Sequence, residues 1–136
     1  MKQKRAIEIL VDDRERGVLN EELEKLGLVV KNERLKTGDY VSGDICFERK
    51  TIDDLCASIM DGRIENQIAC MKQQFKHNFV LISGRIKDKT SEMDENCILG
   101  KIVSLIVKHG VPVIMVDDEE QMAFVIKRIC ERLLVE

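Results

Sequence analysis

The stretch TGDYVSGDICFERKTIDDL, residues 37–55, decides how this 136-residue chain folds. Its centre predicts a β-hairpin, because Ser42-Gly43-Asp44 is a turn sequence that separates two short strand-like runs, Tyr40-Val41 and Ile45-Cys46-Phe47-Glu48. Thr51 then predicts the start of a helix, because a threonine side chain can cap the first helical turn. A hairpin that leads directly into a helix predicts a sheet with helices packed against it.

The alternation of strands and helices continues on both sides of this stretch. Further strands are predicted over residues 6–11, 28–35, 79–82 and 113–116. Helices are predicted over residues 20–26, 51–60, 98–108 and 119–134, with one more between Gly62 and Phe75, and the most loop-like stretch is 85–95. Interleaved strands and helices favour an α/β class with one central sheet.

Length and composition restrict the function further. A chain of 136 residues with 44% hydrophobic and 35% charged residues is typical of one globular domain. No apolar run is long enough to span a bilayer, and the basic residues 1–5 are not followed by a signal-peptide pattern. We therefore expect an intracellular protein, in the cytoplasm or nucleoid, or in the nucleus if the source is eukaryotic.

Charge and cysteine content narrow the possible ligands. The net charge is −3 and the isoelectric point is about 5.5, so any nucleic-acid contact has to come from a local patch or through metal ions. Five cysteines without a Cys-x-x-Cys pair predict buried thiols in a reducing compartment rather than a zinc site or a disulfide framework.

The two C-terminal helices have different apolar patterns. Residues 119–134 carry a single apolar stripe, whereas apolar residues surround most of the helix at 98–107. Such a helix is covered on more than one side. Two arrangements can cover it, which are deep burial within one chain and a subunit interface formed together with the last helix.

Acidic residues gather near the predicted strand ends. Asp12 follows the first strand, Asp39 precedes the hairpin, and Glu48 and Lys50 alternate with Arg49 so that they share a face. If the hairpin loop is Ser42-Gly43, Asp39 faces Cys46 and Glu48 is its diagonal neighbour, within about 8 Å. A loop one residue longer would reverse this parity.

Two carboxylates at that separation can bind one hard cation, Mg²⁺ or Mn²⁺, because such ions prefer oxygen ligands. A bound metal ion lowers the pKa of water and neutralises charge on a phosphate. Lys50 beside it can orient or deprotonate an attacking water, or stabilise the phosphorane by its charge. The pattern Asp-(x)n-Glu-x-Lys thus indicates phosphodiester cleavage, whereas Glu48 and Lys50 taken alone are also compatible with a solvated strand face.

Taken together, Val11-Asp12-Asp13-Arg14-Glu15, Gly38-Asp39-Tyr40 and FERKTIDD (47–54) resemble the XPF family of structure-specific DNA endonucleases, which includes archaeal Hef. The resemblance covers essentially the whole chain, 1–136, as a single nuclease domain. It implies a restriction-endonuclease-like α/β fold, with a mixed central sheet flanked by helices. It leaves no room in this chain for the family's helicase or helix-hairpin-helix domains.

The resemblance also assigns roles to individual residues. Asp39, Glu48 and the backbone carbonyl of Arg49 are implied as ligands of Mg²⁺, for which Mn²⁺ substitutes, with Asp12 as a nearby ligand or holder of its waters. Lys50 is implied as the catalytic lysine. The residues implied to contact phosphate or to support the site are Arg14, Glu15, Asp54, Arg63 and Gln67.

Several of these residues are also compatible with a purely structural role. Asp54 lies in the first turn of a helix, where a carboxylate also caps the N-terminus. Arg63 and Gln67 share a helix face that can simply be solvated. The Arg49 side chain points opposite to Glu48 and can brace Glu15 or Asp54.

The function that follows is a metal-dependent endonuclease that hydrolyses one strand of branched DNA, such as a fork or a 3′-flap, during DNA repair or fork processing. The resemblance implies a homodimer formed through helices 98–108 and 119–134. Two alternatives remain, a non-catalytic scaffold subunit that organises DNA or a partner nuclease, and a different Mg²⁺ hydrolase acting on nucleotides or RNA.

Overall fold

The structure is a computed structural model that describes residues 6–135. The prediction for the basic segment 1–5 therefore lies outside the described residues. The strands are β1 (Glu8–Asp12), β2 (Val29–Glu33), β3 (Tyr40–Ser42), β4 (Ile45–Thr51), β5 (His77–Ser83) and β6 (Val113–Val116). The helices are α1 (Val18–Lys25), α2 (Ile52–Met60), α3 (Arg63–Gln74), α4 (Glu95–Val107) and α5 (Glu119–Cys130), with a short 3₁₀-helix η1 (Ile86–Asp88) and a π-helix η2 (Glu131–Val135) that continues α5.

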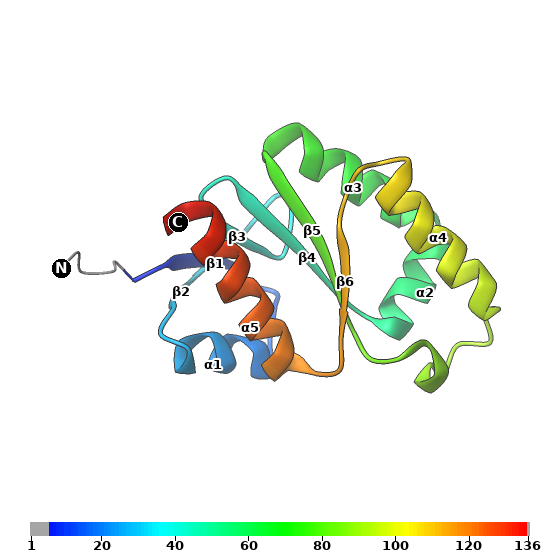
Figure 1. Cartoon of the computed structure of the whole chain (residues 1–136), viewed down its shortest axis with the longest axis horizontal. Helices are drawn as coiled ribbons and strands as arrows, with labels where there is room; N and C mark the ends of the chain where they lie inside the picture. The colour runs from blue at the N-terminus through cyan, green and yellow to red at the C-terminus, as the bar shows by residue number, and fades with distance from the viewer. Residues whose placement is uncertain (1–5, 136) are drawn as a thin grey trace.

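All six described strands form one mixed sheet in the order β2-β1-β3-β4-β5-β6 (Figure 1). β3 pairs antiparallel with both β1 and β4, whereas the pairs β1–β2, β4–β5 and β5–β6 are parallel. The predicted mixed central sheet with flanking helices is therefore confirmed. In this order β1, β3 and β4 are neighbours, and their ends carry the acidic residues that the sequence singled out.

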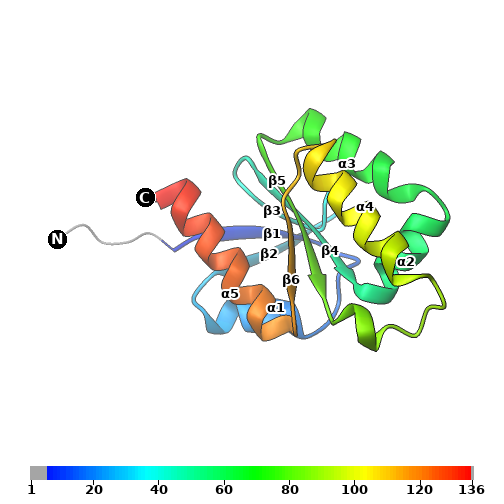
Figure 2. The same ribbon diagram turned by 45° about the vertical axis from the view of Figure 1, so that its right-hand side comes forward.

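The sheet separates two apolar cores (Figure 2). α1 and α5 cover one face, where Phe47 and Leu81 are completely buried. α2, α3 and α4 cover the other face, where Val80 and Ile82 are completely buried. Because side chains alternate along a strand, the even-numbered residues of β4 point toward α2 and α3, and the odd-numbered ones point toward α1 and α5.

The hairpin turn lies one residue later than predicted. Ser42 pairs with Ile45, so the loop is Gly43-Asp44 and not Ser42-Gly43. The backbone conformation explains this position of the turn. Gly43 is the first loop residue and adopts a φ of 59°, a left-handed conformation that glycine reaches at little cost. The register therefore shifts by two positions, which preserves the parity and moves Glu48 closer to Asp39 than the predicted diagonal.

The structure rules out one of the two arrangements considered for the helix at 98–107, and it corrects the burial prediction for two of the five cysteines. In α4, only Ile98 and Leu105 are buried, and Val103 and Val107 are 57% and 78% exposed, so deep burial within one chain does not account for the apolar surface of this helix. All five cysteines are free thiols as predicted, but Cys70 and Cys97 are exposed because they lie on helix faces turned away from the sheet. Among residues 6–135, no helix is both long and apolar enough to cross a membrane.

Candidate active site

A cleft of about 460 Å³ opens where the ends of β1 and β4 meet α3 and the loop before β3. Six of the residues singled out from the sequence line it: Asp12, Arg14, Glu15, Asp39, Glu48 and Gln67. The remaining lining residues are Lys36, Thr37, Gly38, Asn66 and Cys70. The structure thus brings residues from four segments of the chain into one concave site.

The backbone on either side of Asp39 fixes that residue in the cleft. Its N–H donates to the carbonyl oxygen of Phe47 at 3.0 Å, and the Arg49 N–H donates to Asp39 Oδ2 at 2.8 Å. Gly38 adopts a φ of 80°, and a Cβ at this position would collide with Cys46 Sγ. Only glycine therefore lets the chain pass close to β4 and present Asp39 beside Glu48.

Three carboxyl groups crowd together in the cleft. Burial, and then repulsion from Glu48, raise the pKa of Asp39 to about 7. Burial, and then repulsion from Asp39, raise the pKa of Glu15 to about 7. Burial also raises the pKa of Glu48, although the nearby Lys50 opposes this shift. The site therefore concentrates negative charge that a cation would neutralise.

Asp12 differs from these carboxyl groups because it is already paired. Arg14 donates from Nε to Asp12 Oδ2 at 2.7 Å and from its terminal nitrogen to Oδ1 at 3.2 Å. The N–H of Leu35 donates to Asp12 Oδ1 at 2.9 Å. The hydrogen bonds from Arg14 hold the pKa of Asp12 below its usual range. Asp12 and Arg14 together fasten the loop after β2 to the end of β1.

Lys50 is buried on the same side of β4 as Glu48. Its Nζ lies 3.9 Å from Glu48 Oε1 and donates to Ser58 Oγ of α2 at 2.9 Å. Both charged residues are only 6% exposed. The alternation predicted for Glu48 and Lys50 is therefore correct, and the alternative of a solvated strand face is not.

The Arg49 side chain points to the opposite side, as its parity predicts. Its guanidinium contacts Glu119 Oε2 of α5 at 3.0 Å and Glu15 Oε2 at 3.4 Å. The prediction that Arg49 braces Glu15 is confirmed, whereas Asp54 is not its partner. Glu119 is the first residue of α5, and the sequence assigned it no role in the site.

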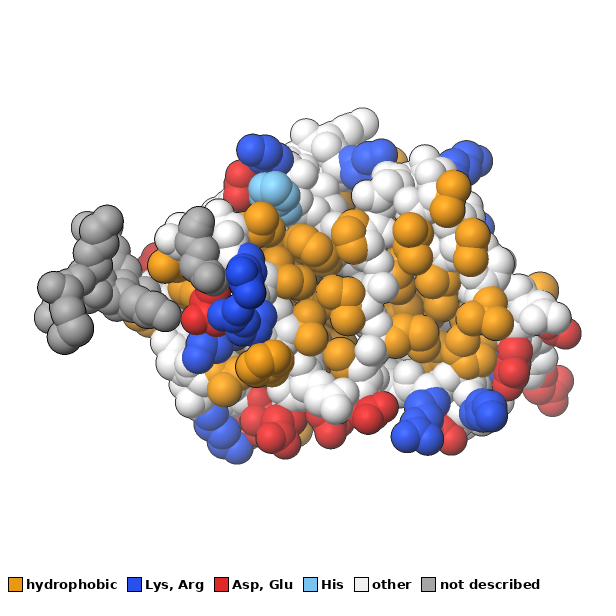
Figure 3. Space-filling model, in the orientation of Figure 1, with side chains coloured by type: hydrophobic (Ala, Val, Ile, Leu, Met, Phe, Trp, Pro, Cys, Tyr) orange, Lys and Arg blue, Asp and Glu red, His pale blue; other side chains and the backbone are white. Residues whose placement is uncertain are grey.

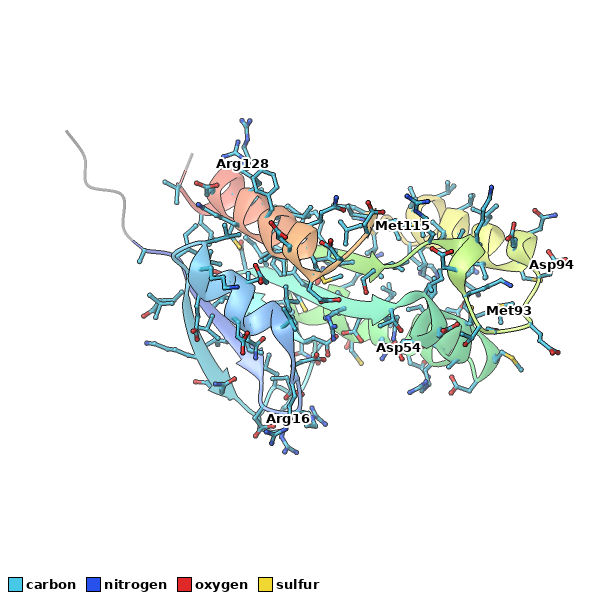
Figure 4. All side chains as sticks on the ribbon, turned by 90° about the horizontal axis from the view of Figure 1, so that it is seen from below. Arg16, Asp54, Met93, Asp94, Met115 and Arg128 are labelled. Carbon is cyan, nitrogen blue, oxygen red and sulfur yellow. The ribbon has the colours of Figure 1, made fainter. Side chains whose placement is uncertain are left out.

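Four of the predicted site residues do not line this cleft: Arg49, Lys50, Asp54 and Arg63. Asp54 forms a capping box with Thr51 at the start of α2, next to the end of β4 (Figure 4), so the capping interpretation is correct. Arg63 is exposed and pairs with Asp61. Gln67, by contrast, lines the cleft, and its buried Oε1 has no hydrogen-bond partner among the described residues 6–135.

Sequence reasoning missed four lining residues outside the family motifs: Lys36, Thr37, Asn66 and Cys70. Asn66 and Cys70 are four residues apart, and so they share a helix face near Gln67. The sequence could have indicated Cys70, because it lies three residues after the predicted site residue Gln67 and residues three or four apart share a helix face. No comparable signal marks Lys36 and Thr37, which reach the cleft through the loop before β3.

The donor chemistry of the cleft fits a hard divalent cation. Within residues 6–135, no three histidine, cysteine, aspartate or glutamate side chains are arranged to hold a metal by themselves. Mg²⁺ does not need such a cage, because it commonly binds through one or two carboxylates and keeps several waters. Asp39 and Glu48 supply such a pair.

The fold and this site place the chain in a known family. Residues 11–129 match the ERCC4 domain, and the chain belongs to that family. It is 31% identical over 129 residues to the 3′-flap repair endonuclease Xpf of Saccharolobus solfataricus, which covers 93% of this chain and 55% of that protein. The chain thus spans about half the length of that relative.

Solved structures agree with the family assignment. The chain is similar to XPF from Aeropyrum pernix, with a TM-score of 0.85 and 28% identity over 92% of this chain and 64% of that one. A structure of the same protein in complex with DNA gives a TM-score of 0.84 and 27% identity, over 96% of this chain and 68% of that one. These matches confirm the predicted family and the restriction-endonuclease-like fold.

Proposed function

We propose that residues 1–136 form the nuclease domain of a structure-specific endonuclease, which hydrolyses one strand of branched DNA in repair or fork processing. The observation that carries this proposal is that Asp39 and Glu48 line one cleft, while the buried ammonium of Lys50 lies 3.9 Å from Glu48 Oε1. Two comparisons support DNA as the substrate. One relative is named a 3′-flap repair endonuclease, and one similar structure is a complex with DNA. An enzyme acting on cellular DNA works inside the cell.

We propose that the cofactor is Mg²⁺, replaceable by Mn²⁺. Asp39 and Glu48 would hold it together with the backbone carbonyl of Arg49, and Asp12 would hold its waters or complete its ligands. The crowded carboxyl groups described above support this assignment, because a divalent cation would relieve their mutual repulsion. When bound, the ion supplies a more acidic water and neutralises charge on the phosphate.

The side chains of Lys50 and Arg14 would orient the water, stabilise charge and contact the DNA. Lys50 Nζ orients the attacking water and stabilises the charge that develops on the phosphorus-bound oxygens. Water attacks phosphorus in line and gives up one proton to solvent as its P–O bond forms, while the bond to the 3′-oxygen breaks and that oxygen takes up one proton from solvent. The products are a 5′-phosphate and a 3′-hydroxyl. Arg14, at the rim of the cleft, contacts a phosphate of the bound strand.

Cleavage of labelled DNA tests this proposal. A fork, a 3′-flap, a plain duplex, an RNA and free nucleotides are incubated with the chain in Mg²⁺ or Mn²⁺. We expect cleavage of the branched DNAs alone, and its loss in Glu48→Gln and Lys50→Ala. Lys87→Ala is the matched control for Lys50, because Lys87 is exposed and lies outside the cleft.

Other outcomes would favour the alternatives. A folded chain that binds branched DNA but cuts nothing at high concentration, even when fused to a helix-hairpin-helix domain, would indicate a scaffold subunit. Equal cleavage of RNA or free nucleotides would indicate a different hydrolase. Cleavage that survives in both Glu48→Gln and Lys50→Ala would place the active site elsewhere.

We also propose that two copies of the chain associate through α4 and α5, within the predicted helices 98–108 and 119–134. Large apolar side chains lie exposed across α4, β6 and α5, and Figure 3 shows them as one broad apolar face. They include Leu99, Val103, Ile106, Val107, Met115 and Phe124. Figure 4 places Met115 between the two helices. Continuous exposed apolar surface of this kind marks an interaction site.

Sedimentation equilibrium tests the association. We expect a dimer, and a monomer when Val103→Lys or Phe124→Lys places a charge in the apolar face, because a buried unpaired charge is costly. Lys87→Glu, outside this face, should leave the dimer intact. If the unaltered chain is monomeric at micromolar concentration, self-association is contradicted. The apolar face would then be expected to bind a different partner chain.

A further inference from the structure

Ser58 is a polar residue on the buried face of α2. The buried residues of this helix are Ile52, Leu55, Cys56 and Ser58, and Ser58 is only 1% exposed. A serine in a helix interior forms the helix less readily than alanine does, and burying its hydroxyl costs free energy unless it is hydrogen-bonded. A residue of this kind is expected to have a specific partner.

That partner is the ammonium of Lys50. Nζ donates a hydrogen bond to Ser58 Oγ at 2.9 Å and lies 3.9 Å from Glu48 Oε1. The glutamate lies beyond hydrogen-bond distance, so the serine supplies the hydrogen bond that the ammonium makes. A buried ammonium without such a bond would be strongly disfavoured.

The connection between β4 and α2 makes this contact possible. α2 begins at Ile52, directly after β4 ends at Thr51, and the Thr51–Asp54 capping box fixes the angle of the helix. Ser58 lies eight residues after Lys50, about two helical turns along α2, and faces back toward the strand. The direct junction between β4 and α2 therefore places Ser58 Oγ within hydrogen-bond distance of the Lys50 ammonium.

We propose that Ser58 is a positioning residue that holds the Lys50 ammonium beside Glu48 but out of a direct ion pair with its carboxylate. The inference deepens the proposed nuclease function and rests on it for the role of Lys50. Without the Ser58 hydroxyl, Glu48 Oε1 is the nearest partner for the ammonium. The two side chains would then close into a direct ion pair, which would withdraw Nζ from the water and occupy a proposed metal ligand.

Three variants of the full chain test the inference. Ser58→Ala removes the hydroxyl, and Ser58→Thr keeps it. Cys56→Ala is the matched structural control, because it removes one buried side-chain atom from the same helix without touching Lys50. Thermal melting confirms that each variant folds.

The first readout is cleavage of a 3′-flap under saturating DNA. We expect Ser58→Ala to lower kcat by about 10- to 100-fold with KM unchanged, because misplacing a reacting group by about 1 Å can cost about 100-fold. Ser58→Thr and Cys56→Ala should stay within about threefold of the unaltered chain. Wild-type kcat in Ser58→Ala, or an equal loss in Cys56→Ala, would overturn the inference. So would a folded Ser58→Thr chain that cleaves as slowly as Ser58→Ala.

The second readout does not require activity. The ammonium groups of ¹⁵N-labelled lysines are observed by NMR, and Lys50→Met identifies the Lys50 signal. A buried, hydrogen-bonded ammonium exchanges its protons slowly, so this signal should be present in the unaltered chain and in Cys56→Ala and be lost or shifted in Ser58→Ala. An unchanged signal in Ser58→Ala would overturn the inference. If the unaltered chain cleaves no DNA, the proposed function fails, while this signal still decides the Ser58 contact.

Discussion

The close approach of Gly38 to β4 leads to a quantitative prediction. Replacing Gly38 by alanine places a Cβ on a residue whose φ is 80°, which costs an L-residue about 1–2 kcal/mol. The same Cβ collides with Cys46 Sγ, and forcing an extra methyl group into a packed core costs about 1–3 kcal/mol more. Gly38→Ala should therefore lower the free energy of unfolding by about 2–5 kcal/mol.

A double-mutant cycle separates these two contributions. Cys46→Ala removes the sulfur but leaves Val41 and the Phe47 carbonyl at ordinary contact distance from the new Cβ. In that background, Gly38→Ala should cost only the backbone part, about 1–2 kcal/mol. Urea unfolding of the four chains measures both costs. An identical cost in both backgrounds, or a cost below about 0.5 kcal/mol in the unaltered chain, would refute the reasoning.

Three further predictions follow from the site and its supports. Without metal, the free energy of unfolding should fall as pH rises from about 4 to about 8. In the folded chain Glu15 and Asp39 keep their protons up to about pH 7, because their pKa values are raised to about 7. In the unfolded chain they lose these protons near their ordinary, lower pKa values, so rising pH favours the unfolded state. Thermal melting across pH measures this fall, Mg²⁺ should reduce it, and stability that rises through this range would contradict it. Asp54→Ala should lower the free energy of unfolding by about 1 kcal/mol, and Asp54→Asn by less, because the first removes the capping box; equal urea midpoints for the two variants would count against the cap. Ellman's reagent should modify Cys70 and Cys97 in the folded chain and the other three thiols only after unfolding, so a third fast thiol would contradict the burial pattern.

The sequence predicted the parts of the site that depend on local order. The alternation along FERK (47–50) placed Glu48 and Lys50 on one face and Arg49 on the other, and the structure agrees. The hairpin turn was misplaced by one residue, because Ser42-Gly43 and Gly43-Asp44 are both acceptable turn sequences and only the backbone geometry separates them. The parity was preserved because the register moved by two positions.

Contacts between distant segments could not be predicted in the same way. Arg49 meets Glu119 seventy residues later in the chain, a pairing that depends on how α5 packs against the sheet. The Lys50–Ser58 contact depends on the angle between β4 and α2. The burial prediction holds for Cys46, Cys56 and Cys130 but is wrong for Cys70 and Cys97, because an apolar neighbourhood in the sequence does not say which face of a helix a thiol occupies.

The central claim is that Asp39 and Glu48 hold a divalent metal ion whose occupancy permits strand cleavage. One titration tests it directly: Mn²⁺ is added to the chain, bound ion is followed by electron paramagnetic resonance, and cleavage of a 3′-flap is measured in the same samples. Occupancy and cleavage should rise together in the unaltered chain, and both should be lost in Asp39→Asn and Glu48→Gln. Unchanged Mn²⁺ binding by these folded variants, or cleavage that persists in them, would contradict the account.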